Sequence, residues 1–173
     1  MHIIVSVMTS VFLACSAAPE AAPDAQAVSA TVEQAEAARQ ALVEWFECEE
    51  CEEGQMQAVV KYGQTVVPSL RSALISGASP ASRELLRREL ASRYDELRKY
   101  QETHPYAKVA SSKEQFIASN LDNLNAQYQV RAAEALSAIG GAAAARALEE
   151  GAGKAKRSDV RESIKKSLAR MKR

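Results

Sequence analysis

Residues 126–140 read AQYQVRAAEALSAIG, and a second glycine follows at Gly141. This stretch ends the longest apolar stripe in the chain, whose members are three or four residues apart: Ile117, Leu121, Leu124, Tyr128, Ala132, Ala135 and Ile139. Such spacing places apolar side chains on one face of an α-helix. Ser112 with Gln115 is typical of a capping box at a helix start, and paired glycines are typical of a helix end. The pattern predicts one long helix from about Ser112 to Gly140.

The rest of the chain after residue 30 also favours helices. Helical signals occupy residues 31–47, Gly54 to Gly63, Val66 to Gly77, Ser79 to about Gln101, residues 142–150, and a C-terminal segment from Asp159 with the stripe Val160, Ile164, Leu168 and Met171. We expect Gly151 and Gly153 to interrupt the chain before the last helix, and Asp159 to cap that helix with Glu162 at the third position. No apolar–polar alternation persists, so the sequence predicts no strands.

Two stretches look like units of one helical repeat. Residues 58–70 (AVVKYGQTVVPSL) place a helix, a glycine turn and a Val-Pro-x-Leu helix start in succession. Residues 130–140 (VRAAEALSAIG) are followed by a second predicted helix and then by Asp159-Val160-Arg161. These motifs resemble HEAT-like repeats of the bacterial type, over residues 58–74 and 126–171, whereas residues 78–111 break the period. The resemblance implies stacked helix pairs, each of which buries its apolar face on its neighbours.

The expected fold class is therefore all-α. It is either a short HEAT-like α–α superhelix or a compact helical bundle of about seven helices, preceded by a signal peptide and a flexible tether. The chain also resembles bacterial envelope proteins in which a W-x-E-C-x-x-C sequence, here residues 45–51, precedes such a repeat. That second resemblance implies no established activity.

The N-terminal residues predict export. Residues 3–14 (IIVSVMTSVFLA) hold no charge, and as a helix they would rise about 18 Å, too short for a hydrocarbon core of roughly 30 Å. Residues 1–14 fit a signal peptide, and Phe12 to Cys15 resembles a lipobox, which implies lipidation of Cys15 and an anchor on the cell envelope, with Ser16 favouring an outer membrane. Ordinary cleavage, which would leave a secreted or periplasmic soluble chain, and an uncleaved anchor are the alternatives. Residues 15–30, rich in Ala and Pro, are expected to form a tether, and residues 31–173 the helical domain.

Charge and composition exclude some classes of protein. The chain has 173 residues, 47% of them hydrophobic, and its 22 Lys and Arg balance its 22 Asp and Glu. This balance excludes a uniformly basic nucleic-acid binder and a disordered chain driven by charge. Residues 1–60 hold ten acidic residues and one basic residue, a balance of −9, and residues 154–173 hold nine basic and two acidic residues, a balance of +7. The chain is acidic at its front and basic at its tail.

Cys48 and Cys51 form a C-x-x-C pair. If Cys15 is lipidated, an even number of cysteines remains, and in an oxidising compartment that favours a disulfide. Free or metal-binding thiols and a redox centre are the alternatives. The redox alternative needs a lowered thiol pKa, whereas the glutamates between Glu44 and Glu53 would raise it. The sequence offers no complete metal-ligand set, so we expect neither a metal nor another cofactor.

The remaining candidate residues point to binding rather than catalysis. The sequence shows no nucleophile elbow, phosphate loop or H-E-x-x-H motif, so we assign no catalytic residue. Trp45 is a candidate for the core, for covering the disulfide or for a recognition groove. Five cations of the tail could bind an anionic partner, dock on the acidic segment Glu44–Glu53, or form a solvated helix face: Lys165, Lys166, Arg170, Lys172 and Arg173.

We therefore expect a non-enzymatic, surface-tethered scaffold for protein–protein interactions in the bacterial cell envelope. Its partner would be another envelope protein of unknown identity, its contact with the membrane would be the N-terminal lipid, and no nucleic-acid partner is expected. The alternative is a small redox or metal-handling envelope protein that uses Cys48 and Cys51.

Overall fold

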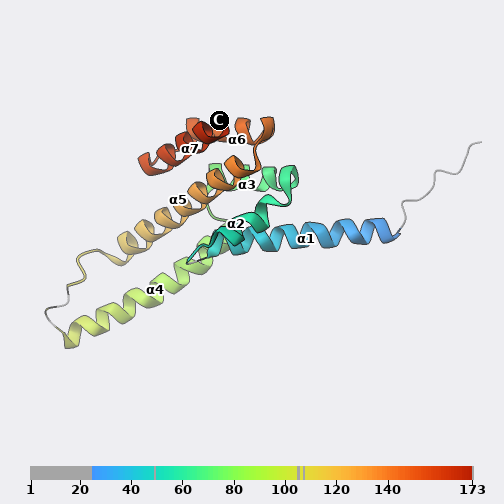
Figure 1. Cartoon of the computed structure of the whole chain (residues 1–173). Helices are drawn as coiled ribbons and strands as arrows, with labels where there is room; N and C mark the ends of the chain where they lie inside the picture. Colours follow the sequence, from blue (N-terminus) through green and yellow to red (C-terminus); the bar gives the residue numbers. More distant parts are fainter. Residues whose placement is uncertain (1–24, 49, 105, 107, 173) are drawn as a thin grey trace, which may run out of the picture.

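The computed structural model describes residues 25–48, 50–104, 106 and 108–172. Within these residues the chain forms seven α-helices, one short 3₁₀ helix and no β-strand (Figure 1). They are α1 (Ala25–Glu47), α2 (Glu53–Val60), the 3₁₀ helix η1 (Gly63–Val66), α3 (Val67–Ser76), α4 (Pro80–Thr103), α5 (Lys113–Ile139), α6 (Gly141–Lys154) and α7 (Ser158–Met171). The prediction of an all-α fold with about seven helices is confirmed.

The longest helix, α5, has the ends that the sequence predicts. At its start the Ser112 hydroxyl accepts from the Gln115 backbone N–H at 3.2 Å, and Gln115 Oε1 accepts from the Ser112 backbone N–H at 3.0 Å. This reciprocal capping box satisfies two backbone donors that the helix leaves free. At its end Gly140 and Gly141 have φ angles of 70° and 83°, a conformation that side chains other than glycine rarely adopt.

The first helix begins earlier than predicted. α1 starts at Ala25, inside the range 15–30 that the sequence assigned to a tether. Pro23 is the last proline before this point, and the three alanines between residues 25 and 30 are strong helix formers. The predicted signal peptide, residues 1–14, and the lipidation residue Cys15 lie outside the described residues.

The last two helices also differ from the prediction. α6 continues through Gly151 and Gly153 to Lys154, because a buried glycine in a helix permits close approach: a Cβ atom on Gly151 would lie 2.5 Å from Leu74 Cδ2. α7 begins at Ser158, with Arg157 at the cap position. Asp159 is therefore not the cap; it lies in the first turn, where a carboxylate still suits the positive end of the helix dipole.

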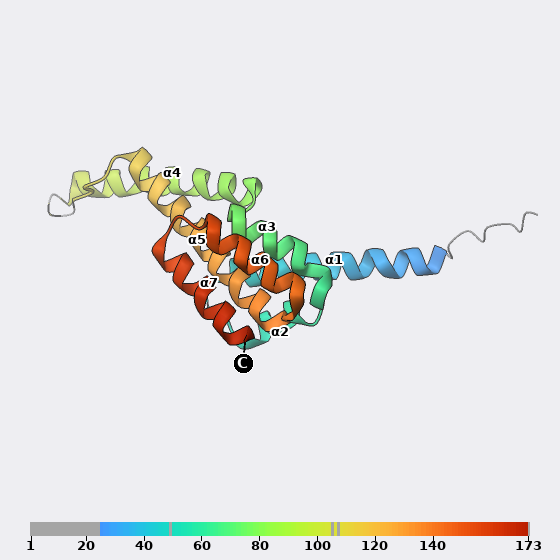
Figure 2. The ribbon, with the colours of Figure 1, turned by 90° about the horizontal axis from the view of Figure 1, so that it is seen from above.

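The core is built around α5, which contacts each of the other described helices (Figure 2). Its small residues Ala132, Ala133 and Ala135 are fully buried and let neighbouring helices approach closely. Large side chains from three neighbours fill the space around them: Leu70 and Leu74 of α3, Leu148 of α6 and Ile164 of α7. Of the two architectures expected, the described part of the chain is the compact helical bundle.

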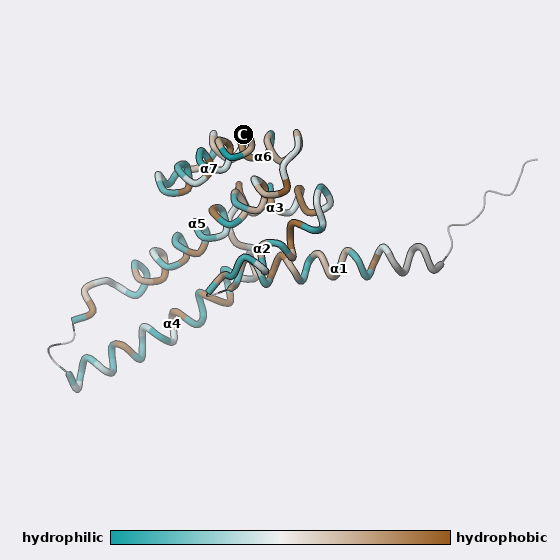
Figure 3. Tube along the Cα trace, in the orientation of Figure 1, coloured by the Kyte–Doolittle hydropathy of each residue, from teal (hydrophilic) through white to brown (hydrophobic). Residues whose placement is uncertain are grey.

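Two segments extend beyond this body. α4 and the first half of α5, residues 80–124, project together as a two-helix arm, and the start of α1 projects the other way (Figures 1 and 2). The arm is fastened by the Tyr94 hydroxyl, which donates to the Ser111 carbonyl at 2.8 Å, and by an ion pair of 2.7 Å between Lys113 and Asp95. α4 is largely hydrophilic along its length (Figure 3). The arm contains most of the segment 78–111 that breaks the repeat period.

No helix in the described part of the chain is both long enough and apolar enough to cross a membrane.

Candidate functional site

A disulfide closes the corner between α1 and α2. Cys48 follows the last residue of α1, and its sulfur is bonded to that of Cys51, with a Cα–Cα distance of 5.4 Å. Glu52 then caps α2, where its backbone N–H donates to Gln55 Oε1 at 2.9 Å. The disulfide thus joins the end of one helix to the start of the next, which is the local role that favours a structural bond.

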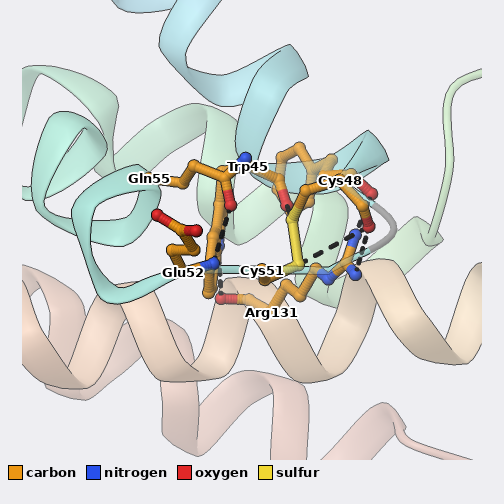
Figure 4. The surroundings of a disulfide bond; sticks show 7 residues. Trp45, Cys48, Cys51, Glu52, Gln55 and Arg131 are labelled. Atoms are coloured by element: carbon orange, nitrogen blue, oxygen red, sulfur yellow. Dashed lines mark hydrogen bonds between the residues drawn. A yellow bond between two sulfur atoms is a disulfide. The ribbon is translucent and has the colours of Figure 1, made fainter.

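Arg131 of α5 holds this corner from across the fold. Its Nη1 donates to the Phe46 carbonyl at 2.5 Å and its Nη2 donates to the Cys48 carbonyl at 2.7 Å (Figure 4). The last carbonyls of a helix lack partners inside the helix, and a cation there also suits the negative end of the dipole. Burial lowers the pKa of Arg131, and Glu134 opposes that shift. The corner is therefore a surface feature clamped by a half-buried guanidinium.

Trp45 lies beneath this clamp. Its side chain is 5% exposed, and its indole N–H donates to the Arg131 carbonyl at 3.1 Å. The Arg131 guanidinium carbon lies 5.9 Å from the centroid of the indole ring, within the range of a cation–π contact. Trp45 is therefore buried in the core beside the disulfide, and it also lines a hollow of the surface.

Tyr128, about one turn before Arg131 on α5, also holds the end of α1. Its ring stacks on Phe46 with 4.6 Å between ring centroids, and its hydroxyl donates to Glu47 Oε1 at 3.0 Å. Burial raises the pKa of Tyr128. The end of α1 is thus pinned to α5 on two sides, by a stacked ring and by a guanidinium.

A groove runs between α5 and α7 from this corner towards the basic tail. Its first hollow is lined by Trp45, Cys51 and Arg131 among others, and its second by residues of α7 that include Lys166 and Arg170. Val130, Glu134 and Asp159 line both hollows. The two hollows are therefore parts of one surface depression, which we call the α5–α7 groove.

An ion-pair network fixes the rim of this groove. Arg157 lies 2.6 Å from Asp122 of α5 and 2.7 Å from Asp159 of α7, and it also donates to Asn123 Oδ1 at 2.9 Å. The hydrogen bond from Arg157, together with one from the Val160 backbone N–H, lowers the pKa of Asp159 to about 2. Arg157 thereby ties the start of α7 to the middle of α5.

The cations of the tail separate into different surfaces. Lys166 and Arg170 line the far half of the groove. Lys165 on α7 and Lys172, at the cap that follows α7, are exposed outside it. Arg173 lies outside the described residues. Among the described residues, no ion pair joins this tail to the acidic segment 44–53, so the structure does not show docking between the two, which was one of the three alternatives.

The sequence reasoning missed the side chains that organise the site. It found only acidic residues around the sulfurs, whereas the structure brings Arg131 there from 83 residues away. It also missed Arg157, because the sequence of a basic tail does not show which of its cations pairs with α5. For Arg131 the sequence did offer a signal, because it is the arginine of the Val130-Arg131 pair at the start of the repeat-like motif. Within the part of the chain that the structure describes, no group of three His, Cys, Asp or Glu could hold a metal ion.

Comparison with protein-family models, with curated proteins and with solved structures gave no match.

Proposed function

We propose that this chain is a non-enzymatic, surface-tethered scaffold of a bacterial cell envelope that binds a segment of another envelope protein in the α5–α7 groove. The observation that supports this proposal is the continuity of the groove, in which two hollows share Val130, Glu134 and Asp159. Both walls are helices of the core. A pre-formed groove of this kind loses little conformational freedom on binding.

The charges of the groove indicate the kind of segment that it suits. Arg131 and Arg157 are engaged by carbonyls and carboxylates of the chain itself. Glu134 and Arg170 have no ion pair in the described structure, and Lys166 lies 4.0 Å from Glu162. The groove therefore presents both signs of charge, and its apolar lining is limited to Trp45, Ala126 and Val130. This suits a polar segment with mixed charges better than an apolar helix.

Site-specific photo-crosslinking in intact cells tests this proposal. A photoreactive residue at Ser163, which lines the groove, should give a discrete crosslinked species with one envelope protein. The matched control places the same residue at Ala142, which is exposed on α6. The charge reversals Lys166→Glu and Arg170→Glu should weaken the Ser163 product. Equal products from both positions, or none from Ser163, would contradict binding in the groove.

The tether has its own test, because its residues lie outside the described part of the chain. Cys15→Ser removes the proposed lipidation residue and should move the protein from the membrane fraction to the soluble fraction. Retention of the variant in the membrane fraction would contradict the lipid anchor and leave the groove proposal untouched.

A second candidate function, dithiol–disulfide exchange at Cys48 and Cys51, is favoured by one observation. Cys51 is exposed and lines the groove, and a guanidinium lies at the same corner; a nearby cation lowers the pKa of a thiol. Thiol titration in a graded series of glutathione buffers tests it. In a redox protein the fraction of free thiol should follow the potential of the glutathione buffer, whereas a structural disulfide should stay oxidised in mild reductant.

A further inference from the structure

One ridge of α4 carries a self-complementary pattern. Leu85, Glu89, Arg93 and Leu97 follow one another at intervals of four residues, so they form a single ridge on the helix surface. Leu85 is 53% exposed and Leu97 is 38% exposed. The ridge thus has an apolar residue at each end and one charge of each sign between them.

This ridge has no partner within the described chain that would explain it. α4 packs on α5 through Leu90 and Tyr94, its two buried residues. Leu85, Glu89 and Arg93 lie roughly 60–140° around the helix from Leu90, whereas Leu97 lies nearer the packing face. Glu89 and Arg93 make no ion pair or side-chain hydrogen bond in the described structure, although neighbouring charges of α4 and α5 do so. Exposed leucines on a projecting arm are an apolar surface that a partner can cover.

We propose that a second copy of this chain covers the ridge, in an antiparallel two-fold pairing centred midway between Glu89 and Arg93. In that pairing Leu85 faces Leu97 of the second copy, and Glu89 faces Arg93 of the second copy. A two-fold axis repeats each contact, so both ends of the ridge bury leucines and both charge pairs are satisfied at once. Ridges with this four-residue spacing pack against each other at a crossing angle of about −50°, the commonest class in globular proteins.

A hollow at the start of the ridge supplies a second complementary feature. Its apolar lining includes Phe46, Leu85, Leu86 and Leu124, and its polar lining includes Glu47, Ser82, Glu89 and Gln127. At the other end of the ridge Tyr100, one turn beyond Leu97, is 49% exposed. The antiparallel pairing brings Tyr100 of the second copy opposite Ser82, at this hollow. An exposed aromatic ring and a partly apolar hollow are thus placed at opposite ends of one surface, as a symmetric dimer requires.

The ridge is short, so the contact between the two copies is small. Twelve residues of helix rise about 18 Å, so the contact is at the small end of specific interfaces. We therefore expect a weak dimer, which forms and dissociates over the micromolar range. The surface lies on α4, outside the α5–α7 groove, so dimerisation and the proposed partner binding can be tested separately.

Charge reversal at the two central residues tests the pairing by sedimentation velocity over a dilution series of the full chain. The wild-type chain should sediment as a concentration-dependent dimer. With Arg93→Glu, each copy would place a glutamate opposite Glu89 of the other copy. With Glu89→Arg, each copy would place an arginine opposite Arg93 of the other copy. Each variant alone should therefore be monomeric. An equimolar mixture of the two variants should recover the dimer, because each chain then supplies the charge that the other lacks. The double variant with both changes should also dimerise.

The matched control is Arg88→Glu, an exposed charge change on the same helix, roughly 140° around it from Arg93. It should leave the dimer intact, and circular dichroism should show the same helix content in all variants. A wild-type chain that is monomeric throughout the series would overturn the proposal. A dimer that survives both single reversals, or variants that stay monomeric when mixed, would overturn it as well.

Discussion

The guanidinium of Arg131 on α5 donates to the backbone carbonyl of Cys48, which is 83 residues earlier and 2.7 Å away. Together with the bond to the Phe46 carbonyl, this contact makes the disulfide corner depend on the central helix. The disulfide fixes the local geometry between α1 and α2, and the side chain of Arg131 attaches this corner to α5.

Replacing Arg131 should destabilise the whole fold. Arg131→Gln removes the charged donor to both carbonyls, and hydrogen bonds of charged groups contribute roughly 2 kcal/mol each. We expect the free energy of unfolding in urea to fall by about 2–3 kcal/mol, with Arg131→Lys between this variant and wild type because an ammonium cannot reproduce the fork. The control is Arg161→Gln, an exposed arginine on α7. An unchanged urea midpoint for Arg131→Gln would show that the clamp adds no stability.

Removing the disulfide should cost little stability. A bond across two intervening residues closes a very short loop, so it restricts the unfolded chain only slightly. The double variant Cys48→Ser and Cys51→Ser should lose at most about 2 kcal/mol of unfolding free energy. Circular dichroism should be unchanged, and so should the emission of Trp45, the single tryptophan. A red-shifted emission would mean instead that the bond is what keeps Trp45 buried.

Two glycines of α6 should respond in opposite ways to alanine. A Cβ on Gly151 would meet Leu74 Cδ2 at 2.5 Å and Cγ at 2.7 Å, and such overpacking typically costs about 1–3 kcal/mol. Gly153 lies in the same helix with nothing within 4 Å of its added Cβ. Through helix propensity, Gly153→Ala should therefore raise the free energy of unfolding by a few tenths to about 1 kcal/mol and so raise the melting temperature, while Gly151→Ala should lower both. A drop of similar size in both variants would indicate that Leu74 does not set the limit at Gly151.

Acid should weaken the contact between α3 and α6. Hydrogen bonds from Arg71 and Lys154, at 2.6 and 2.7 Å, lower the pKa of Glu150 from 4.5 to about 2. A carboxyl whose pKa is lower in the folded chain stabilises the fold above its ordinary pKa. This contribution should be lost as the pH falls from about 4.5 to about 2.

Glu150→Gln tests this pH dependence. The variant should melt at a lower temperature than wild type at neutral pH, and the gap should close as the pH falls through that window. Because Arg71 and Lys154 are exposed and Glu150 is only half-buried, added salt should shrink the gap at neutral pH. Glu149→Gln, next to it and exposed, is the control. A gap that persists at the acid end would point to a packing role for Glu150 instead.

Local signals in the sequence predicted the helices well because each helix has its own start and stop residues. The capping box at Ser112 and the glycine pair after Ile139 define α5 without reference to the rest of the chain. The same reasoning was wrong at Gly151, where a glycine that is read locally as a helix breaker serves a contact with Leu74. Helix propensity describes a single segment, whereas Gly151 is required by its contact with another helix, α3.

The candidate site was predictable only in part. The spacing of Cys48 and Cys51 favours a disulfide over free thiols, and the structure contains that bond. The groove did not follow, because it exists only where α5 and α7 lie side by side, and Arg157 belongs to it through Asp122 on the other helix. A stripe on one helix predicts which residues face inward, but it does not say which two outward edges will meet.

The central position of α5 has a consequence for how the chain is made. α4 packs chiefly on α5, and α1, α2 and α3 also contact it, yet α5 is not complete until residue 139. During synthesis the first hundred residues emerge before the helix on which they pack, and we expect the domain to complete its folding only after α5 has been made. We expect such a chain to stay open to the proposed export while it is being made.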